Sequence, residues 1–222
     1  PIEVVVAVPA NAHSTQRFIT LDAFRRAGFS VRAMLNEPSA AGLEYAHRYK
    51  NTFNSKRENV VIYDLGGGTF DAALVTMANG RHDVRTTSGV ARLGGDDFDE
   101  ALLDLAIEAH GLARALQPSE RSALLNECRF AKEALHPNTK RIALDLAALG
   151  EDAPASPVLV AVTDYYDRIR PLVTRSLDAL EPVLAIAAEP GDANGSAAVA
   201  ELAGIYVVGG ASGLPLVPRV LR

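Results

Sequence analysis

The sequence predicts an α/β fold with mixed sheets and crossover helices, and three observations support that class. Short apolar, β-branched runs such as residues 4–8 and 60–64 are typical of buried strands. Longer segments with apolar residues at helical spacing alternate with these runs. Glycine-rich turns follow several strands, and they join a strand either to another strand or to a helix. Hairpins combined with crossover helices indicate an α/β architecture.

The first part of the chain alternates strands with helices. The expected elements are a strand over 4–8, a helix over 14–28, a strand over 31–35 and a helix over 38–48. The first strand is continuously apolar, so we expect it to be covered on both faces. The hydroxyl of Ser14 or Thr15 can cap the first helix, and Pro38 fits the first turn of the second.

The middle of the chain begins with three strands. The expected elements are strands over 60–64, 70–78 and 84–90, helices over 94–110 and 119–135, and an antiparallel pair over 140–146 and 158–163. Asn79-Gly80 is a strong hairpin turn. Asp96 and Asp97 stand in the first turn of the helix over 94–110, where acidic side chains complement the helix dipole.

The last part of the chain returns to a strand after a long helical region. The expected elements are a helix over 163–180, a helical segment from 182, a strand over 203–208 and a helix over 214–221. Pro171 predicts an interruption or kink, and Pro182 predicts the start of a separate segment. Polar residues predict a connector over 51–58 and a loop over 189–196.

Composition narrows the function classes. The formal net charge of −5 and the isoelectric point of about 5.6 give no basic surface for a nucleic acid. The sequence contains no run of eighteen apolar residues, so it predicts no membrane-spanning helix. The single cysteine, Cys128, fits a reducing compartment, and we expect a cytoplasmic protein. The chain begins at Pro1 without an initiator methionine, which leads us to expect a piece of a longer protein.

The motif with the most specific chemistry is a glycine-tipped hairpin with an acid on each side. A strand ends at Asp64, the glycines 66–68 follow, and Thr69 and Asp71 begin the next strand. Glycines let backbone N–H groups close around an anion, and two carboxylates beside a phosphate suit a cation that keeps several waters. The alternative is a tight turn with two solvated acids, but three glycines weaken a strand more than such a turn requires.

Three further positions are weaker signals by themselves. Gly94 and Gly95 stand at a helix N-terminus that favours an anion, although glycine and aspartate are also ordinary caps there. Gly209-Gly210 follows a strand and would let a base or ribose approach the backbone, or it forms a simple tight turn. Glu37 is held at a strand–helix junction, where an acidic residue is common for structural reasons.

Together these motifs resemble the seventy-kilodalton heat-shock protein family, the DnaK-like chaperones. The match rests on five motifs in the family's order: Val8-Pro9-Ala10, residues 36–41 (NEPSAA), 64–71 (DLGGGTFD), 93–99 (LGGDDFD) and Val208-Gly209-Gly210. The resemblance covers essentially the whole chain. It implies an actin-like ATPase fold, related to ribonuclease H, in which two lobes enclose Mg-ATP.

The resemblance also implies a division into lobes. Residues 1–57 would be the C-terminal part of the first lobe and 58–222 the second lobe. The core of the second lobe would comprise about 58–94 and 164–222, with a subdomain inserted over about 95–163. The family's first phosphate loop, with its own metal-binding aspartate, and its catalytic lysine would precede Pro1. The chain alone is therefore expected to hydrolyse ATP very poorly.

The resemblance assigns roles to residues of this chain. It implies a catalytic set of Glu37, Asp64, Thr69 and Asp71, with Asp64 and Asp71 associated with the metal. It implies a cofactor-binding set of Gly66, Gly67, Gly68, Thr69, Gly94, Gly95, Arg129, Lys132, His136, Gly209, Gly210 and Ala211. The implied cofactors are ATP or ADP with Mg²⁺ held mostly through water, and K⁺ as well. Phosphoryl transfer at such a site works by positioning and charge neutralisation.

The predicted adenine pocket departs from the family. Arg129 stands where the family commonly has an acid that binds ribose hydroxyls, and His136 stands where it has a small hydroxyl residue. Gly213 replaces an arginine that stacks on adenine, and Glu133 stands where a basic residue is common. These changes predict a divergent member and leave its base preference open.

Three functions remain in competition. The first is an Mg-ATPase whose nucleotide state controls lobe closure, client proteins and co-chaperones. The second is a scaffold or exchange-factor-like module without significant ATPase activity, which the altered adenine pocket favours. The third is a small-molecule kinase of the wider superfamily, for which the sequence offers no acceptor pocket. The phosphate-site residues Glu37, Asp64, Thr69 and Asp71 favour the first.

Overall fold

The computed structural model describes residues 1–10, 12–49, 58–78, 81–187 and 202–222, which fall into two compact units. The first unit comprises Pro1–Tyr63, Asp71–Ser88 and Leu180–Val207. The second unit comprises Asp64–Phe70, Gly89–Ala179 and Val208–Arg222. The predicted Asn79-Gly80 turn, the predicted loop over 189–196 and nearly all of the predicted connector over 51–58 lie outside the described residues.

The first unit begins with two parallel strands joined by a helix, in the strand–helix–strand order that the sequence predicted. The elements are β1 (Glu3–Val8), α1 (Ser14–Arg26), β2 (Ser30–Asn36) and α2 (Glu37–Arg48), and β1 pairs in parallel with β2. The predicted cap at Ser14 or Thr15 is wrong, since α1 is preceded by His13 at the N-cap. The side chain of Gln16 accepts a hydrogen bond of 2.8 Å from the His13 N–H, in the manner of a capping box.

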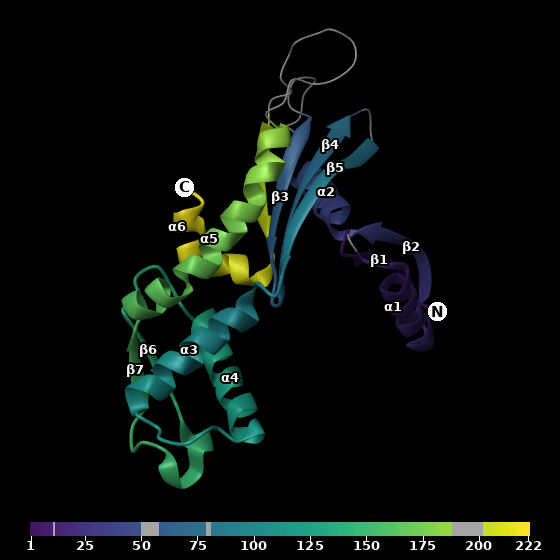
Figure 1. The fold of residues 1–222 in the computed structure, drawn as a ribbon. Helices are drawn as coiled ribbons and strands as arrows, with labels where there is room; N and C mark the ends of the chain where they lie inside the picture. Colours follow the sequence, from purple (N-terminus) through teal and green to yellow (C-terminus); the bar gives the residue numbers. More distant parts are fainter. Residues whose placement is uncertain (11, 50–57, 79–80, 188–201) are drawn as a thin grey trace. The chain divides into compact units, whose positions relative to one another are not determined.

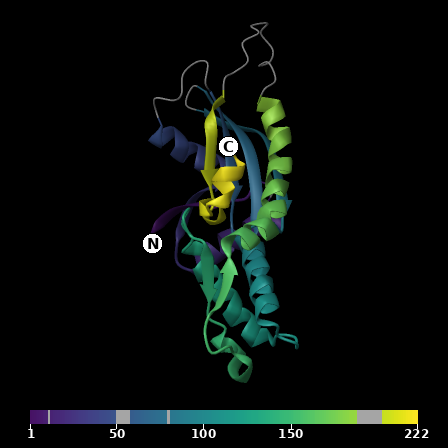
Figure 2. The ribbon, with the colours of Figure 1, turned by 90° about the vertical axis from the view of Figure 1, so that its left-hand side faces the viewer.

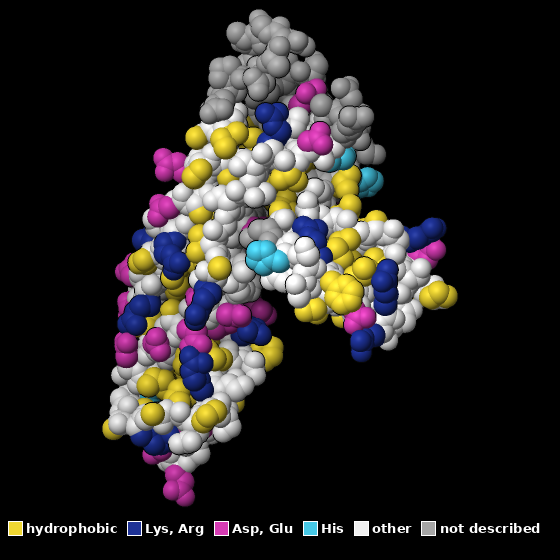
Figure 3. Space-filling view, turned by 45° about the vertical axis from the view of Figure 1, so that its right-hand side comes forward, with side chains coloured by type: hydrophobic (Ala, Val, Ile, Leu, Met, Phe, Trp, Pro, Cys, Tyr) yellow, Lys and Arg dark blue, Asp and Glu magenta, His cyan; other side chains and the backbone are white. Residues whose placement is uncertain are grey.

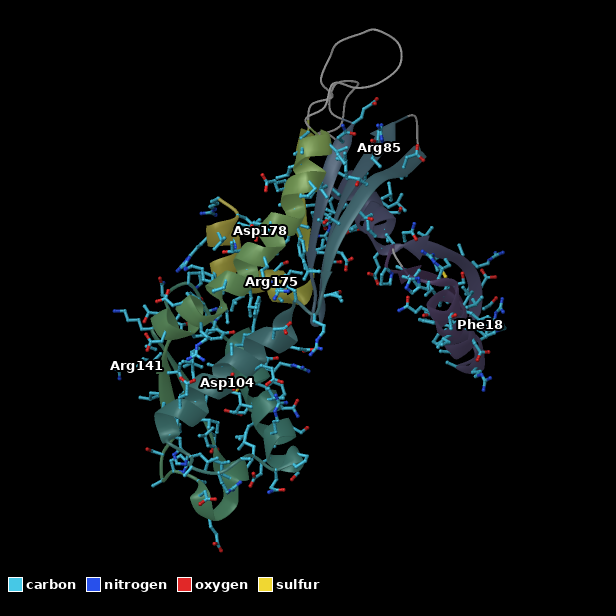
Figure 4. All side chains as sticks on the ribbon, viewed as in Figure 1. Phe18, Arg85, Asp104, Arg141, Arg175 and Asp178 are labelled. Atoms are coloured by element: carbon cyan, nitrogen blue, oxygen red, sulfur yellow. The ribbon has the colours of Figure 1, made fainter. Side chains whose placement is uncertain are left out.

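The expectation that β1 is covered on both faces is also wrong for this structure. Val6 and Val8 are buried, but Val5 between them is 59% exposed. Because strand side chains alternate between faces, one face of β1 packs and the other is open. Phe18 of α1 is 66% exposed and extends from the helix in Figure 4.

A four-stranded sheet continues the chain in the order β5-β4-β3-β8 (Figure 1). Its strands are β3 (Asn59–Leu65), β4 (Thr69–Ala78), β5 (Arg81–Ala91) and β8 (Leu202–Val208). In β3, Val60 to Tyr63 are at most 1% exposed, as expected for a central strand covered on both faces. Helix α2 packs against the sheet within the first unit, since the Tyr45 hydroxyl donates to Ala203 O at 3.4 Å and its ring lies 5.1 Å from that of Tyr206.

The second unit contains a helical layer and a small hairpin. Its elements are α3 (Gly95–His110), α4 (Pro118–Glu133), β6 (Arg141–Leu144), β7 (Val158–Ala161) and the first part of α5 (Val162–Ala187). The predicted antiparallel pair is confirmed, with Arg141 opposite Ala161 (Figure 2). A short 3₁₀ helix, η2 (Ala147–Asp152), forms in the connection that the sequence predicted as a loose loop.

Helix α5 contradicts the predicted break at Pro171 and the separate segment from Pro182, because it is one helix of 26 residues. Its buried residues recur at intervals of three and four, and both prolines are on the exposed side. The buried positions include Tyr165, Ile169, Val173, Ser176, Leu180 and Val183. Packing of this stripe offsets the hydrogen bonds that the prolines remove.

The chain ends in the second unit with η3 (Gly210–Gly213) and α6 (Leu216–Val220). Acidic and basic side chains are interspersed on the face that Figure 3 shows. No helix among the described residues is long and apolar enough to cross a membrane.

Candidate functional site

The glycine loop between β3 and β4 is tied by its carbonyl groups to the start of α3. The Leu93 N–H donates to Gly68 O at 3.2 Å, the Gly95 N–H to Gly66 O at 3.0 Å and the Asp96 N–H to Gly67 O at 2.7 Å. Two free N–H groups at the start of α3 are thereby satisfied by the loop rather than by water. The loop and the first turn of α3 are thus joined by three backbone hydrogen bonds.

Two glycines around this element are required by close packing. A Cβ on Gly94 would overlap the carbonyl group of Gly67, although the extended backbone of Gly94 suits any residue. Gly209 combines a φ of 87° with backbone contact, and its Cβ would lie 2.5 Å from the Asp64 carboxylate. A side chain at either position would force the backbone apart.

The glycines at the tip of the loop have no such packing reason. A Cβ on Gly67 or Gly68 would come no closer than 3.8 Å to the Asp96 carboxylate, which is ordinary contact. Both glycines and Thr69 are exposed. The tip therefore presents bare backbone to whatever binds there.

Two cations from α4 reach the first turn of α3. The Lys132 ammonium donates to Gly95 O at 2.7 Å and lies 2.7 Å from Asp99 Oδ1. The Arg129 guanidinium lies 2.9 Å from Asp96 Oδ1 and 3.4 Å from Asp99 Oδ2. Lys132 is only 8% exposed, whereas the Arg129 side chain is 48% exposed. The positive charge of Lys132 is therefore held beside the glycine loop in a mostly dry setting.

Burial is the main cause of the pKa shifts of Asp99 and Cys128. It raises the pKa of Asp99, and the ion pairs with Lys132 and Arg129 offset part of that rise. Burial also raises the pKa of Cys128 to about 12, with a further contribution from Asp99. Burial therefore favours the thiol form of Cys128 over the thiolate.

Three acidic residues of the α3 motif have contacts that the sequence did not predict. Asp96 faces the tip glycines and pairs with Arg129, and Asp97 accepts the Gly94 N–H at 2.9 Å. Asp99 is 1% exposed. Two sequence signals pointed to Asp99: its place at the end of the 93–99 motif and its spacing of one helical turn from Gly95. Neither signal predicted that the side chain is buried.

The second unit brings together most of the predicted site residues. Linked by the contacts above are Asp64, Gly66, Gly67, Gly68, Gly94, Gly95, Arg129, Lys132 and Gly209, and Ala211 Cβ lies 3.5 Å from the position of a Cβ on Gly95. Thr69 closes the loop, since its carbonyl accepts the Gly66 N–H at 3.0 Å. Gly210 lies between Gly209 and Ala211.

Glu37, Asp71 and His136 complete the predicted set. Glu37 and Asp71 belong to the first unit, at the start of α2 and in β4. His136 is exposed after α4, where its N–H donates to Thr139 Oγ1 at 3.0 Å.

The carboxylates do not form a dedicated metal cage. No group of three or more His, Cys, Asp or Glu side chains that could hold a metal occurs in the described part of the chain. Magnesium does not require such a group, since it usually binds one or two carboxylates, several waters and substrate phosphates.

Comparisons with known proteins give a consistent result. Residues 2–222 match the family model described as Hsp70 protein. The chain is 35% identical over 218 residues to the "Chaperone protein HscA homolog" of Bordetella pertussis, covering 96% of this chain and 32% of that protein. It is 34% identical over 229 residues to the "Chaperone protein dnaK1" of Prochlorococcus marinus, covering 100% of this chain and 32% of that protein. The chain thus spans about a third of the length of these relatives.

These matches confirm the family that the motifs predicted, and with it the actin-like α/β fold class and a nucleotide-binding domain of the chaperone type. They do not favour the scaffold alternative. The roles of single residues and the division into lobes at 57/58 stay predictions.

Proposed function

The chain belongs to the Hsp70 protein family, and from this premise we propose that its second unit binds the phosphates of ATP and ADP at the glycine loop. The observation that carries the proposal is the difference among the glycines. Gly94 and Gly209 are required by the protein's own packing, but Gly67 and Gly68 are exposed and have room for a Cβ. A ligand that approaches the backbone closely supplies the missing reason for glycine at the tip.

We propose that Mg²⁺ accompanies the nucleotide. Asp64 and Asp71 would hold the ion, mostly through water, and the bound ion would neutralise charge on the phosphates. The Thr69 hydroxyl would orient the terminal phosphate, and Glu37 would hold water near the metal. K⁺ as an additional ion belongs to the same proposal.

We propose that α4 and the turn after β8 contact the nucleoside. Lys132 and the Gly209–Ala211 turn meet at Gly95, so a nucleotide with phosphates at the loop would extend toward them. Arg129 and His136 would lie at the base and ribose end. Because Arg129 is already paired with Asp96 and Asp99, its contribution to affinity would be smaller than that of Lys132.

The whole protein's activity is a broader proposal. We propose that the whole protein is a cytoplasmic chaperone that hydrolyses ATP and acts on client proteins together with co-chaperones. Its nucleotide state would control the closure of two lobes, divided near residue 57.

The test is Mg-dependent ATP binding and hydrolysis by the full-length protein and two variants. Thr69→Ala and Asp64→Asn are each expected to lower turnover at least tenfold, because positioning and charge neutralisation supply most of the rate at such sites. Turnover unchanged by both variants would refute the proposed site. Binding without turnover in the wild type would instead favour the scaffold function.

A matched glycine pair tests the phosphate contact without relying on turnover. Gly67→Ala is expected to fold with near-native stability and to bind Mg-ADP at least tenfold more weakly. Gly28→Ala is a control far from the loop in sequence, in the turn after α1. Because Gly28 has a φ of 88°, this variant is expected to lose stability but to keep native Mg-ADP affinity. Native affinity in Gly67→Ala would show that the tip does not contact the phosphates.

A further inference from the structure

We infer that Asp99 is a positioning residue of the nucleotide site, which holds the Lys132 ammonium where it can meet the ligand. Asp99 lies in α3 one turn after Gly95 and is 1% exposed. Since its carboxylate is too buried to touch a ligand, it acts through its partners. This inference rests on the proposed nucleotide site.

The geometry links Asp99 to both cations of α4. Its Oδ1 lies 2.7 Å from the Lys132 ammonium, and its Oδ2 lies 3.4 Å from Arg129 Nε. Lys132 and Arg129 are three residues apart on one helix face, so that one carboxylate can serve both. Asp99 is thus the contact that α4's two candidate nucleotide residues share.

The ammonium has capacity left for a ligand. It carries three N–H donors. One is given to Gly95 O at 2.7 Å, and Asp99 Oδ1 occupies at most one more, since it lies 2.7 Å away as an ion-pair partner without a regular hydrogen bond. One donor therefore remains for a ligand oxygen. A Cβ on Gly95 would lie 3.1 Å from the ammonium nitrogen, which shows how closely Lys132 approaches the turn that holds the glycine loop.

Lys132 needs Asp99 to stay in this place. A cation near a helix N-terminus is repelled by the helix dipole, and the lysine side chain is long and flexible. The Asp99 carboxylate supplies the opposing charge from within the helix. Without it, we expect the ammonium to leave the turn and the ligand to lose its contact.

The experiment is a double-mutant cycle on the full-length protein, with the dissociation constant of Mg-ADP measured by titration calorimetry. The variants are Asp99→Asn, Lys132→Met and the double variant. Asp99→Asn is expected to weaken binding about tenfold, as for loss of one charged hydrogen bond. The double variant is expected to bind no more weakly than Lys132→Met alone. Asp104→Asn, an exposed change on the same helix (Figure 4), is the control and should bind as the wild type does.

The double variant also keeps the test decisive if Asp99→Asn does not fold. Removing one member of a buried pair leaves an unpaired charge, whereas replacing both members with neutral groups is well tolerated. If Asp99→Asn is too unstable to measure, the double variant is compared with Lys132→Met. An affinity about tenfold weaker in the double variant would mean that Asp99 acts independently of Lys132, and it would overturn the inference.

A second readout follows the ammonium without a nucleotide. In the wild type, a slowly exchanging Lys132 ammonium signal is expected by ¹⁵N NMR, and Asp99→Asn should lose it. Loss of the signal with unchanged Mg-ADP affinity would overturn the positioning role. A wild type that shows the ammonium signal but binds no nucleotide would defeat the proposed function and the inference that rests on it.

Discussion

The two ends of the candidate site are built in different ways. At the glycine loop, backbone groups form the contacts, and Gly94 and Gly209 allow no side chain. On α4, side chains form the contacts, and half of the Arg129 surface is open. A backbone-built site changes only if the fold changes, whereas a side-chain site changes with single substitutions. The departures from the family that the sequence analysis predicted, at Arg129, Glu133, His136 and Gly213, all fall outside the loop.

The substitution with the largest expected effect on this contrast is Gly94→Ala. The new Cβ would overlap the Gly67 carbonyl group, so the loop and the α3 turn must separate. We expect a loss of about 3 kcal/mol or more in the free energy of unfolding, measured by urea denaturation. Gly67→Ala is the matched control, with an expected change of about 0.5 kcal/mol. Equal losses in the two variants would contradict the division into packing and ligand-binding glycines.

Tyr165→Phe tests whether the stability of the buried interior can change without a change in nucleotide affinity. The Tyr165 side chain is fully buried, its hydroxyl has no hydrogen-bond partner among the described residues, and burial raises its pKa. Removing an unsatisfied buried hydroxyl should raise the free energy of unfolding by about 1 kcal/mol, with Mg-ADP affinity unchanged. A destabilised variant would indicate that the hydroxyl has a partner in solution.

Arg129→Ala probes the side-chain end. The ion pairs of Arg129 are partly exposed, so the loss of stability should stay below about 1 kcal/mol. We expect the ratio of the ADP and GDP dissociation constants to change, and both nucleotides to keep their Mg²⁺ dependence. An unchanged ratio would place Arg129 outside the base and ribose contacts.

The smallest expected effect concerns an ion-pair network distant in sequence from the loop. Hydrogen bonds from Arg114 and from the Gln117 backbone lower the pKa of Glu120 from its ordinary 4.5 to about 2. Because the folded pKa is depressed, this stabilisation is present above about pH 4.5 and is lost as the pH falls toward 2. Urea unfolding between pH 5 and pH 3 should therefore show a weaker pH dependence in Glu120→Gln than in the wild type, and parallel curves would contradict the pairing.

The motifs and most elements could be predicted from the sequence because their causes are local. An apolar run such as 60–64 predicts a buried strand, and three glycines between two strands predict a hairpin tip. The predictions failed where distant residues decide the outcome. Pro171 and Pro182 break helices in isolation, but in α5 they stand on the exposed side of a helix with a packed stripe. The buried role of Asp99 could not be predicted, since its partners lie 30 and 33 positions away on α4.

By itself the sequence determined the family and the fold class, because these depend on short motifs in a fixed order. It also located the glycine loop between two strands. Only the tertiary structure decided which glycines pack against backbone and which stay open. It also decided that α4 delivers Lys132 to the first turn of α3. The physical reason is that steric overlap and ion pairing act between atoms that are close in space, and the sequence alone does not contain those distances.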